Sequence, residues 1–274
     1  MDFGVSYTPE QQAFRAAARA WLEEYVPSDL NIPPDGGPLD PQIQERVKGF
    51  RRKLGEKGWL APSWPTEYGG GGLSSDFDLV LAEEMRRLKL PSMGDNNRWI
   101  PAMMVWGTEE QKRRFIPPSL RGETISWQAF NEPDSGSDFA TVHTQAVPAE
   151  GGYLITGEKA FITGRFDPDH LVTLAVTDPD RPAKFNLGVF MVDARLSGVS
   201  IKTMRLLMGS ERRIYFDEVY VPEDCLIGPP FQGWEIAMTI IEAERGGAAF
   251  RVSDDGTVES IYRFLRDQRT PQDG

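Results

Sequence analysis

The chain has 274 residues, enough for about two domains. Its 41 acidic and 30 basic residues leave a net charge of −11, which argues against nucleic acid as a partner because phosphate binding needs a basic face. The single cysteine, Cys225, excludes an internal disulfide, and two histidines, His143 and His170, are too few and too far apart in sequence to suggest a metal site.

The N-terminal residues 1–6 lack the basic segment and apolar stretch of a signal peptide. No apolar run approaches the roughly 18 to 20 residues that a membrane helix needs. We therefore expect a soluble, cytoplasmic protein with no membrane segment.

The first part of the chain has helical spacing. Segments 8–11 and 108–111 both place glutamine three residues after threonine, the capping-box pattern that begins a helix. The apolar spacing predicts a helix that starts at residue 9 and ends before Pro27, and others over 41–57, 75–88 and from 109 onward.

Beyond Gly122 the pattern changes to short alternating segments. Strands are predicted at the following positions: 125–130, 153–155, 161–163, 171–176, 187–192 and 214–216. Closely spaced strands without intervening helices indicate an antiparallel barrel or sandwich. Helical spacing returns at Gly233 and continues to about residue 266, so the order of elements predicts an α+β fold.

The last predicted helix carries an apolar stripe that needs a partner surface, either the preceding domains or another chain. The residues of the stripe are Trp234, Ala237, Met238, Ile241, Arg245, Ala248 and Val252.

Several nucleotide and hydrolase motifs are absent. No G-x-G-x-x-G, no G-x-x-x-x-G-K-[ST] and no G-x-S-x-G occurs. The four glycines at 69–72 lie between predicted helices and are interpreted as a turn. A nicotinamide-binding Rossmann unit and a serine hydrolase are both disfavoured.

Segment 131–138, Asn-Glu-Pro-Asp-Ser-Gly-Ser-Asp, follows the first predicted strand. Ser135, Gly136 and Ser137 can direct backbone N–H groups and hydroxyls toward an anion. The alternative is a connecting turn whose Asp and Ser side chains bond only their own backbone. A second alternative is a glycosidase-like carboxylate pair made by Glu132 and Asp138.

Segment 157–164 places Phe161 and Thr163 on one face of a strand, an arrangement that suits a flat heteroaromatic ring. Core packing of Phe161 is the alternative. On the last helix, Glu244 and Arg245 lie at or near the apolar stripe, where a buried charge is costly unless it is used. Either Glu244 is a general base, or Arg245 snorkels and Glu244 is solvated.

Taken together, these segments resemble the acyl-CoA dehydrogenase family. The resemblance rests on segments 131–138, 152–164 and 216–222 and on Gly233-Trp234 leading to Glu244-Arg245. It implies a helical N-terminal domain at 1–123, an antiparallel β-barrel middle domain at 124–232 and, at 233–274, the first helix of a C-terminal bundle that is otherwise missing.

The resemblance also implies FAD and oxidation of an acyl thioester to its α,β-unsaturated form, with the α-proton going to Glu244 and the β-hydride to flavin N5. It implies that Gln128, Phe130 and Asn131 line the flavin ring and that Phe161 and Thr163 cover it. Gly136 and Ser137 would meet the pyrophosphate, with Ser137 also near the substrate. Arg245 would orient the ligand or neighbouring helices.

The implied partners are an acyl-CoA substrate, an electron-transfer flavoprotein as electron acceptor, and further subunits in a homo- or hetero-oligomer. One alternative is a non-catalytic or truncated subunit that associates with a full-length dehydrogenase, and another is an oxidase or flavin monooxygenase on the same fold. The sequence leaves open the acyl chain and whether CoA or an acyl carrier protein carries it.

Overall fold

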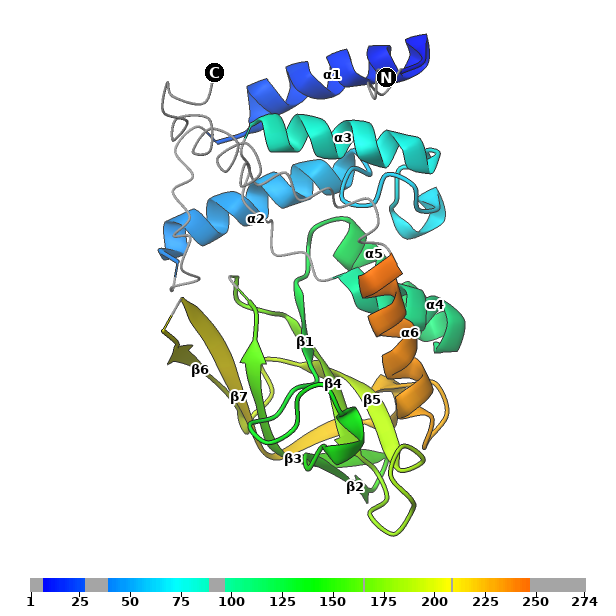
Figure 1. Cartoon of the computed structure of the whole chain (residues 1–274), viewed down its shortest axis with the longest axis vertical. Coiled ribbons are helices and arrows are strands. Elements are labelled where there is room, and N and C mark those ends of the chain that lie inside the picture. Colours follow the sequence, from blue (N-terminus) through cyan, green and yellow to red (C-terminus); the bar gives the residue numbers. More distant parts are fainter. Residues whose placement is uncertain (1–6, 28–38, 89–96, 165, 208, 247–274) are drawn as a thin grey trace, which may run out of the picture.

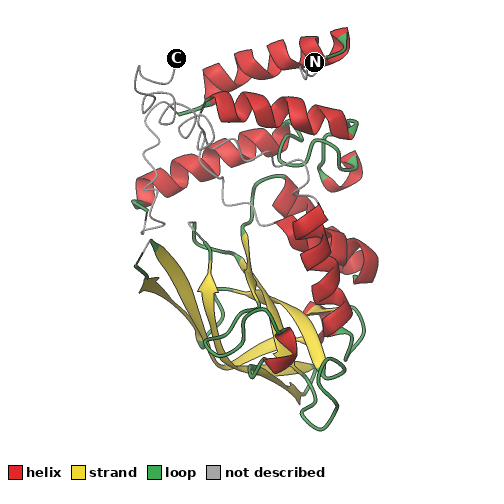
Figure 2. Cartoon of the chain, in the orientation of Figure 1, coloured by secondary structure: helices red, strands yellow, loops and turns green. Residues whose placement is uncertain are grey.

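A computed structural model describes residues 7–27, 39–88, 97–164, 166–207 and 209–246. Three helices lie at one end, the strands at the other, and the remaining helices lie beside the sheet (Figures 1 and 2). The helices are α1 (Pro9–Tyr25), α2 (Pro41–Glu56), α3 (Ser75–Arg87), α4 (Ile100–Trp106), α5 (Glu109–Leu120) and α6 (Gly233–Gly246). The strands are β1 (Ser126–Ala129), β2 (Gln145–Ala149), β3 (Gly152–Ile162), β4 (His170–Val176), β5 (Leu187–Asp193), β6 (Val199–Arg205), β7 (Ser210–Pro222) and β8 (Leu226–Ile227). The α+β fold class is confirmed.

Both predicted capping boxes are present. At α1 the Thr8 hydroxyl accepts from the Gln11 amide at 3.2 Å, and the Gln11 side chain accepts from the Thr8 amide at 2.8 Å. Thr108 and Gln111 repeat the arrangement at α5. The predicted starts of α2 and α3 are also confirmed, and each of these helices ends one residue before its predicted limit. Local signals therefore define these four helices well.

One buried carboxylate joins α1 to α3. Glu84 is 1% exposed and accepts hydrogen bonds from Arg15 and Arg19 of α1 and from Arg87 of α3, the two shortest being 2.8 Å from Arg19. Hydrogen bonds from Arg19 lower the pKa of Glu84 to about 2, with further lowering from Arg87 against the opposing effect of burial. We call these four residues the Glu84 cluster.

The strands form one sheet in the order β6-β7-β3-β2-β4-β5-β8, with β1 attached to β4. Most pairs are antiparallel, as predicted, but β1 and β2 both run parallel to β4. Residues 130–144 carry the chain back before β2 begins, so β2 and then β4 run in the same direction as β1. The sheet is therefore more mixed than the purely antiparallel arrangement that was predicted.

Two predicted strands are one. Segment 153–155 and the first two residues of segment 161–163 are joined as β3, which pairs along β7 with register shifts after Ile155 and after Lys159. Thr163 lies just beyond the strand. These irregularities interrupt the alternation that sequence reading depends on. Four further elements have no counterpart among the predicted ones: α4, β2, β6 and β8.

Helix α6 packs against α4, β4 and β5. Its large buried side chains are Ile236 and Ile240, beside the predicted stripe, while Ala237 of the stripe is also buried and Arg245 is exposed. Arg245 therefore does not belong to the face of α6 that packs on the sheet of this chain, and that face is formed by small and β-branched side chains. Trp234, Met238 and Ile241 are half-buried, while Ala248, Val252 and the predicted continuation to 266 lie outside the described residues.

In the part of the chain that the structure describes, every helix is too short or too polar to traverse a bilayer.

Candidate functional site

The structure brings together two segments that are about 30 residues apart. The Ala160 amide donates to the Asn131 carbonyl at 2.9 Å, immediately after β1 and next to the end of β3. Asn131 therefore lies beside Phe161, and the predicted ring-lining segments 128–131 and 161–163 meet at one place on the sheet.

Phe161 sits in a β-bulge. Pairing with β7 shifts register between Lys159 and Ile162, and Phe161 has φ of 57°. This left-handed conformation is unfavourable for a large side chain and is found mainly where surrounding structure holds it. The side chain is 47% exposed, so the core-packing alternative is wrong. The bulge turns a large aromatic ring outward.

Thr163 is exposed two residues further along, and its hydroxyl donates to Glu211 at 3.3 Å. Gly164 follows it against the buried Trp127. A Cβ at position 164 would lie 2.2 Å from Cε2 of that indole, so only glycine fits. The Trp127 ring thus supports the strand end that presents Thr163.

The residues of the β1 segment differ in exposure. Gln128 and Asn131 are half-buried. Phe130 is 2% exposed and packs edge-to-face on Phe139, with ring centroids 5.6 Å apart. Its side chain is therefore committed to the core, and a ligand at this position would meet its main-chain atoms.

The loop after Asn131 is braced from within. The Ser135 hydroxyl donates to the Asp138 carbonyl at 3.0 Å and accepts from Thr141 at 2.9 Å. Gly136 and Ser137 are exposed, and a Cβ at Gly136 would meet no atom within 4 Å. The loop thus bonds its own backbone, as one alternative predicted, and still presents Gly136 and Ser137 to solvent.

The interpretation of Glu132 and Asp138 as a catalytic carboxylate pair is wrong. Glu132 is 4% exposed and accepts from the Lys159 ammonium at 2.8 Å and from the amides of His143 and Thr144 at 2.6 and 2.9 Å. Asp138 accepts from the Ala140 amide at 3.1 Å. Both carboxylates are engaged in holding backbone.

Lys159 is a residue that the sequence analysis missed. It is 0% exposed and also donates to the Phe130 carbonyl at 3.2 Å. Burial lowers the pKa of Lys159 to about 8, against the raising effect of the Glu132 charge. Burial raises the pKa of Glu132, but the charge and hydrogen bond of Lys159 outweigh it, so the net pKa shift is downward. No local pattern marks a lysine as buried.

Glu244 forms an ion pair with Arg98, which lies in a short 3-10 helix (Asn97–Trp99) before α4. The two side chains are 34% and 32% exposed. Helix α6 packs on β4, and β4 pairs with β1 along the register Gln128↔Val172. Glu244 thus contacts the helical segment before α4, next to the sheet that carries the ring-lining residues. Arg245, the next residue on α6, is exposed.

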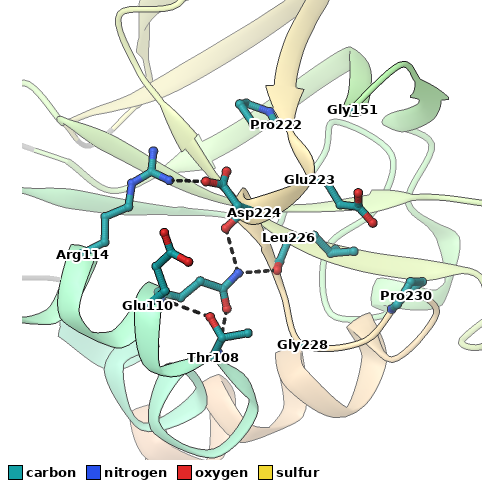
Figure 3. Close-up of a pocket in the computed structure, with 11 residues that line it drawn as sticks. Thr108, Glu110, Arg114, Gly151, Pro222, Glu223, Asp224, Leu226, Gly228 and Pro230 are labelled. Carbon is teal, nitrogen blue, oxygen red and sulfur yellow. Dashed lines mark hydrogen bonds and ion pairs between the residues drawn. The ribbon is translucent and has the colours of Figure 1, made fainter.

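A pocket of about 550 Å³ lies elsewhere, between α5 and the segment after β7 (Figure 3). The Gln111 side-chain amide donates to the carbonyls of Asp224 and Leu226 at 2.8 and 2.7 Å, and Arg114 pairs with Asp224 at 2.9 Å. No candidate site residue lines this pocket. We interpret it as a junction between the helices and the sheet.

Two family models match the chain. The acyl-CoA dehydrogenase N-terminal domain matches residues 8–123, and the acyl-CoA dehydrogenase middle domain matches residues 128–219. The chain therefore belongs to the acyl-CoA dehydrogenase family, as the sequence motifs indicated.

Individual relatives agree. Acyl-CoA dehydrogenase FadE34 of Mycobacterium tuberculosis is 34% identical over 218 residues, which are 78% of this chain and 30% of the relative. Acyl-CoA dehydrogenase FadE29 of the same organism is 28% identical over 94% of this chain and 65% of the relative. A solved structure, the Tcur3481-Tcur3483 steroid ACAD, matches with a TM-score of 0.78 and 27% identity, covering 99% of this chain and 71% of the other. The chain thus spans 65% or less of these two curated relatives.

Proposed function

We propose that this chain acts as an FAD-dependent acyl-CoA dehydrogenase, with Glu244 as the base that removes the substrate α-proton. The observation that carries the proposal is the Asn131–Ala160 hydrogen bond, which sets exposed Phe161 and Thr163 beside segment 128–131 in a chain of this family.

The residues gathered there fit a flavin. Gln128, Asn131 and Thr163 offer uncharged donors and acceptors next to an outward aromatic ring, which matches a flat ring edged with carbonyls and nitrogens. Gly136 and Ser137 offer an exposed main chain and a hydroxyl for the pyrophosphate. When bound, FAD supplies the hydride acceptor.

The protein's own contribution is to place a carboxylate. Glu244 would accept the α-proton at a side-chain oxygen, and Arg98 would fix the direction of that carboxylate through the ion pair. Arg245, exposed on the next position of α6, would contact the substrate from the solvent side. An acyl thioester would therefore approach the end of α6 that carries Glu244 and Arg245.

The test begins with the purified chain and added FAD, since a protein that stays colourless overturns the proposal. Glu244→Gln should then lower turnover of an acyl-CoA at least about 1,000-fold, the upper part of the range for general-base catalysis, with the flavin spectrum unchanged. The matched control is Glu242→Gln, an exposed residue on the same helix that should retain wild-type turnover. Undiminished turnover in Glu244→Gln removes Glu244 as the base.

A second candidate function is that of a subunit that works with a longer dehydrogenase chain. It is favoured by the half-buried Trp234, Met238 and Ile241 on α6. Measurement of mass in solution distinguishes the two, because an active, flavin-loaded oligomer of this chain alone eliminates the subunit hypothesis. The solved relative's printed name makes a steroid acyl-CoA one substrate to assay.

We further propose electron-transfer flavoprotein as the electron acceptor and the cytoplasm as the location. Reduced enzyme that consumes oxygen rapidly would instead favour an oxidase or monooxygenase.

A further inference from the structure

A buried ion pair lies directly beneath the candidate flavin site. Lys159 and Glu132 are 0% and 4% exposed, and their charged atoms are 2.8 Å apart. We call these two residues the Lys159–Glu132 strut. Its other hydrogen-bond partners are main-chain groups: the Phe130 carbonyl on the lysine side and the amides of His143 and Thr144 on the carboxylate side. The exposed His143 imidazole also lies 3.6 Å from the carboxylate.

The strut connects the segments that would touch one ligand. Lys159 belongs to β3, two residues before Phe161, and it holds the carbonyl of Phe130, next to Asn131. Glu132 opens the loop whose tip is Gly136 and Ser137. The ring-lining, ring-covering and pyrophosphate segments are therefore joined through one pair of side chains.

The stability of the fold alone gives little reason for such a pair. Burying an ammonium and a carboxylate costs several kcal/mol per ion, and well-packed apolar residues often serve at least as well in stability. What a charged pair offers in addition is direction: it demands specific main-chain partners and rejects other arrangements of the loop.

We infer that Lys159 and Glu132 are positioning residues for the flavin, holding the 128–131 segment, the Phe161 bulge and the 132–138 loop in their binding geometry before the cofactor arrives. This inference rests on the proposed FAD function. It concerns residues that lie below the ligand surface and would not touch the ligand themselves.

The test compares FAD affinity, measured by quenching of flavin fluorescence, with thermal stability. Lys159→Met should weaken FAD binding at least tenfold. Glu84→Gln, which disturbs a buried carboxylate in the other domain, should lower the melting temperature yet keep FAD affinity within twofold of wild type. If wild type fails to bind FAD, the proposed function falls and this inference with it. If wild type binds and folded Lys159→Met binds equally well, only the inference falls.

Glu132→Gln is a second variant in case Lys159→Met does not fold, because it keeps the shape of the side chain; the same tenfold loss is expected, and an unchanged affinity overturns the inference. Hydrogen exchange on the wild-type apoprotein needs no variant. The amides of His143, Thr144 and Ala160 should be protected before FAD is added. Protection that arises only after FAD is added would contradict positioning in advance.

Discussion

Glu84 and Glu132 are two buried carboxylates with different surroundings. Glu84 meets three arginines from two helices, and those arginines are 22%, 45% and 40% exposed. Glu132 meets one fully buried lysine, two main-chain amides and, at 3.6 Å, the exposed imidazole of His143. Glu84 has several cationic partners, which connect one helix to another, so the loss of one leaves the others. Glu132 has a single buried cationic partner, which connects a loop to a strand. A carboxylate that binds several cations stabilises the packing of the helices that carry them. A carboxylate that binds main-chain amides determines the conformation of the loop to which they belong.

The largest expected effect is that of Glu132→Gln on stability. Removing the charge leaves the Lys159 ammonium in the interior with the Phe130 carbonyl and a neutral amide, which should lower the free energy of unfolding by about 3 to 5 kcal/mol. Urea denaturation measures this loss. Glu84→Gln is the comparison, and its free energy of unfolding should fall by about 2 kcal/mol, because the arginines around Glu84 are partly exposed and can regain water. If Glu132→Gln lowers the free energy of unfolding less than Glu84→Gln does, the Lys159–Glu132 strut is the more redundant of the two arrangements.

The next effect is acid sensitivity of the helical domain. The pKa of Glu84 is lowered to about 2 from a usual 4.5, so its stabilisation is fully present above pH 4.5 and is lost as pH falls toward 2. Wild type should lose about 2 kcal/mol more than Glu84→Gln over this interval. Urea denaturation at several pH values tests this, and parallel pH curves for the two proteins would show that the carboxylate is not held ionised by its arginines.

The smallest effect is expected from Arg15→Met. Arg19 and Arg87 still bind Glu84, so the loss should stay below about 1 kcal/mol. The experiment measures whether the remaining arginines of the Glu84 cluster can replace the one that is removed. A loss as large as that of Glu84→Gln would show that the cluster depends on one arginine, as the strut depends on one lysine.

The sequence predicted what depends on neighbours along the chain. The two residues of each capping box, Thr8 with Gln11 and Thr108 with Gln111, are three residues apart, so the sequence predicts both boxes. The family motifs indicate the 131–138 loop and the Phe161 segment. The Lys159–Glu132 strut was not readable, because its partners are 27 residues apart and meet only when β3 lies beside the end of β1.

Arg98 and Glu244 are separated by 146 residues, and nothing near either one in the chain indicates the other. The bulge at Phe161 was hidden for a similar reason: its two sides are defined by pairing with β7, which is distant in sequence. Strand β6, Val-Ser-Ile-Lys-Thr-Met-Arg, was missed because its alternation of apolar and polar residues shifts by one position at Thr203-Met204.

Gln111 belongs to the start of α5 and to the sheet at once. Its side-chain oxygen accepts from the Thr108 amide at 3.0 Å, and its nitrogen donates to the carbonyls of Asp224 and Leu226. Fraying of the first turn of α5 would therefore weaken the hold on β8, which otherwise depends on its pairing with β5, and departure of β8 would weaken the helix start. This amide adds to the packing of α6 on β4 and β5 in linking the helical and sheet regions, which should melt in a single cooperative transition.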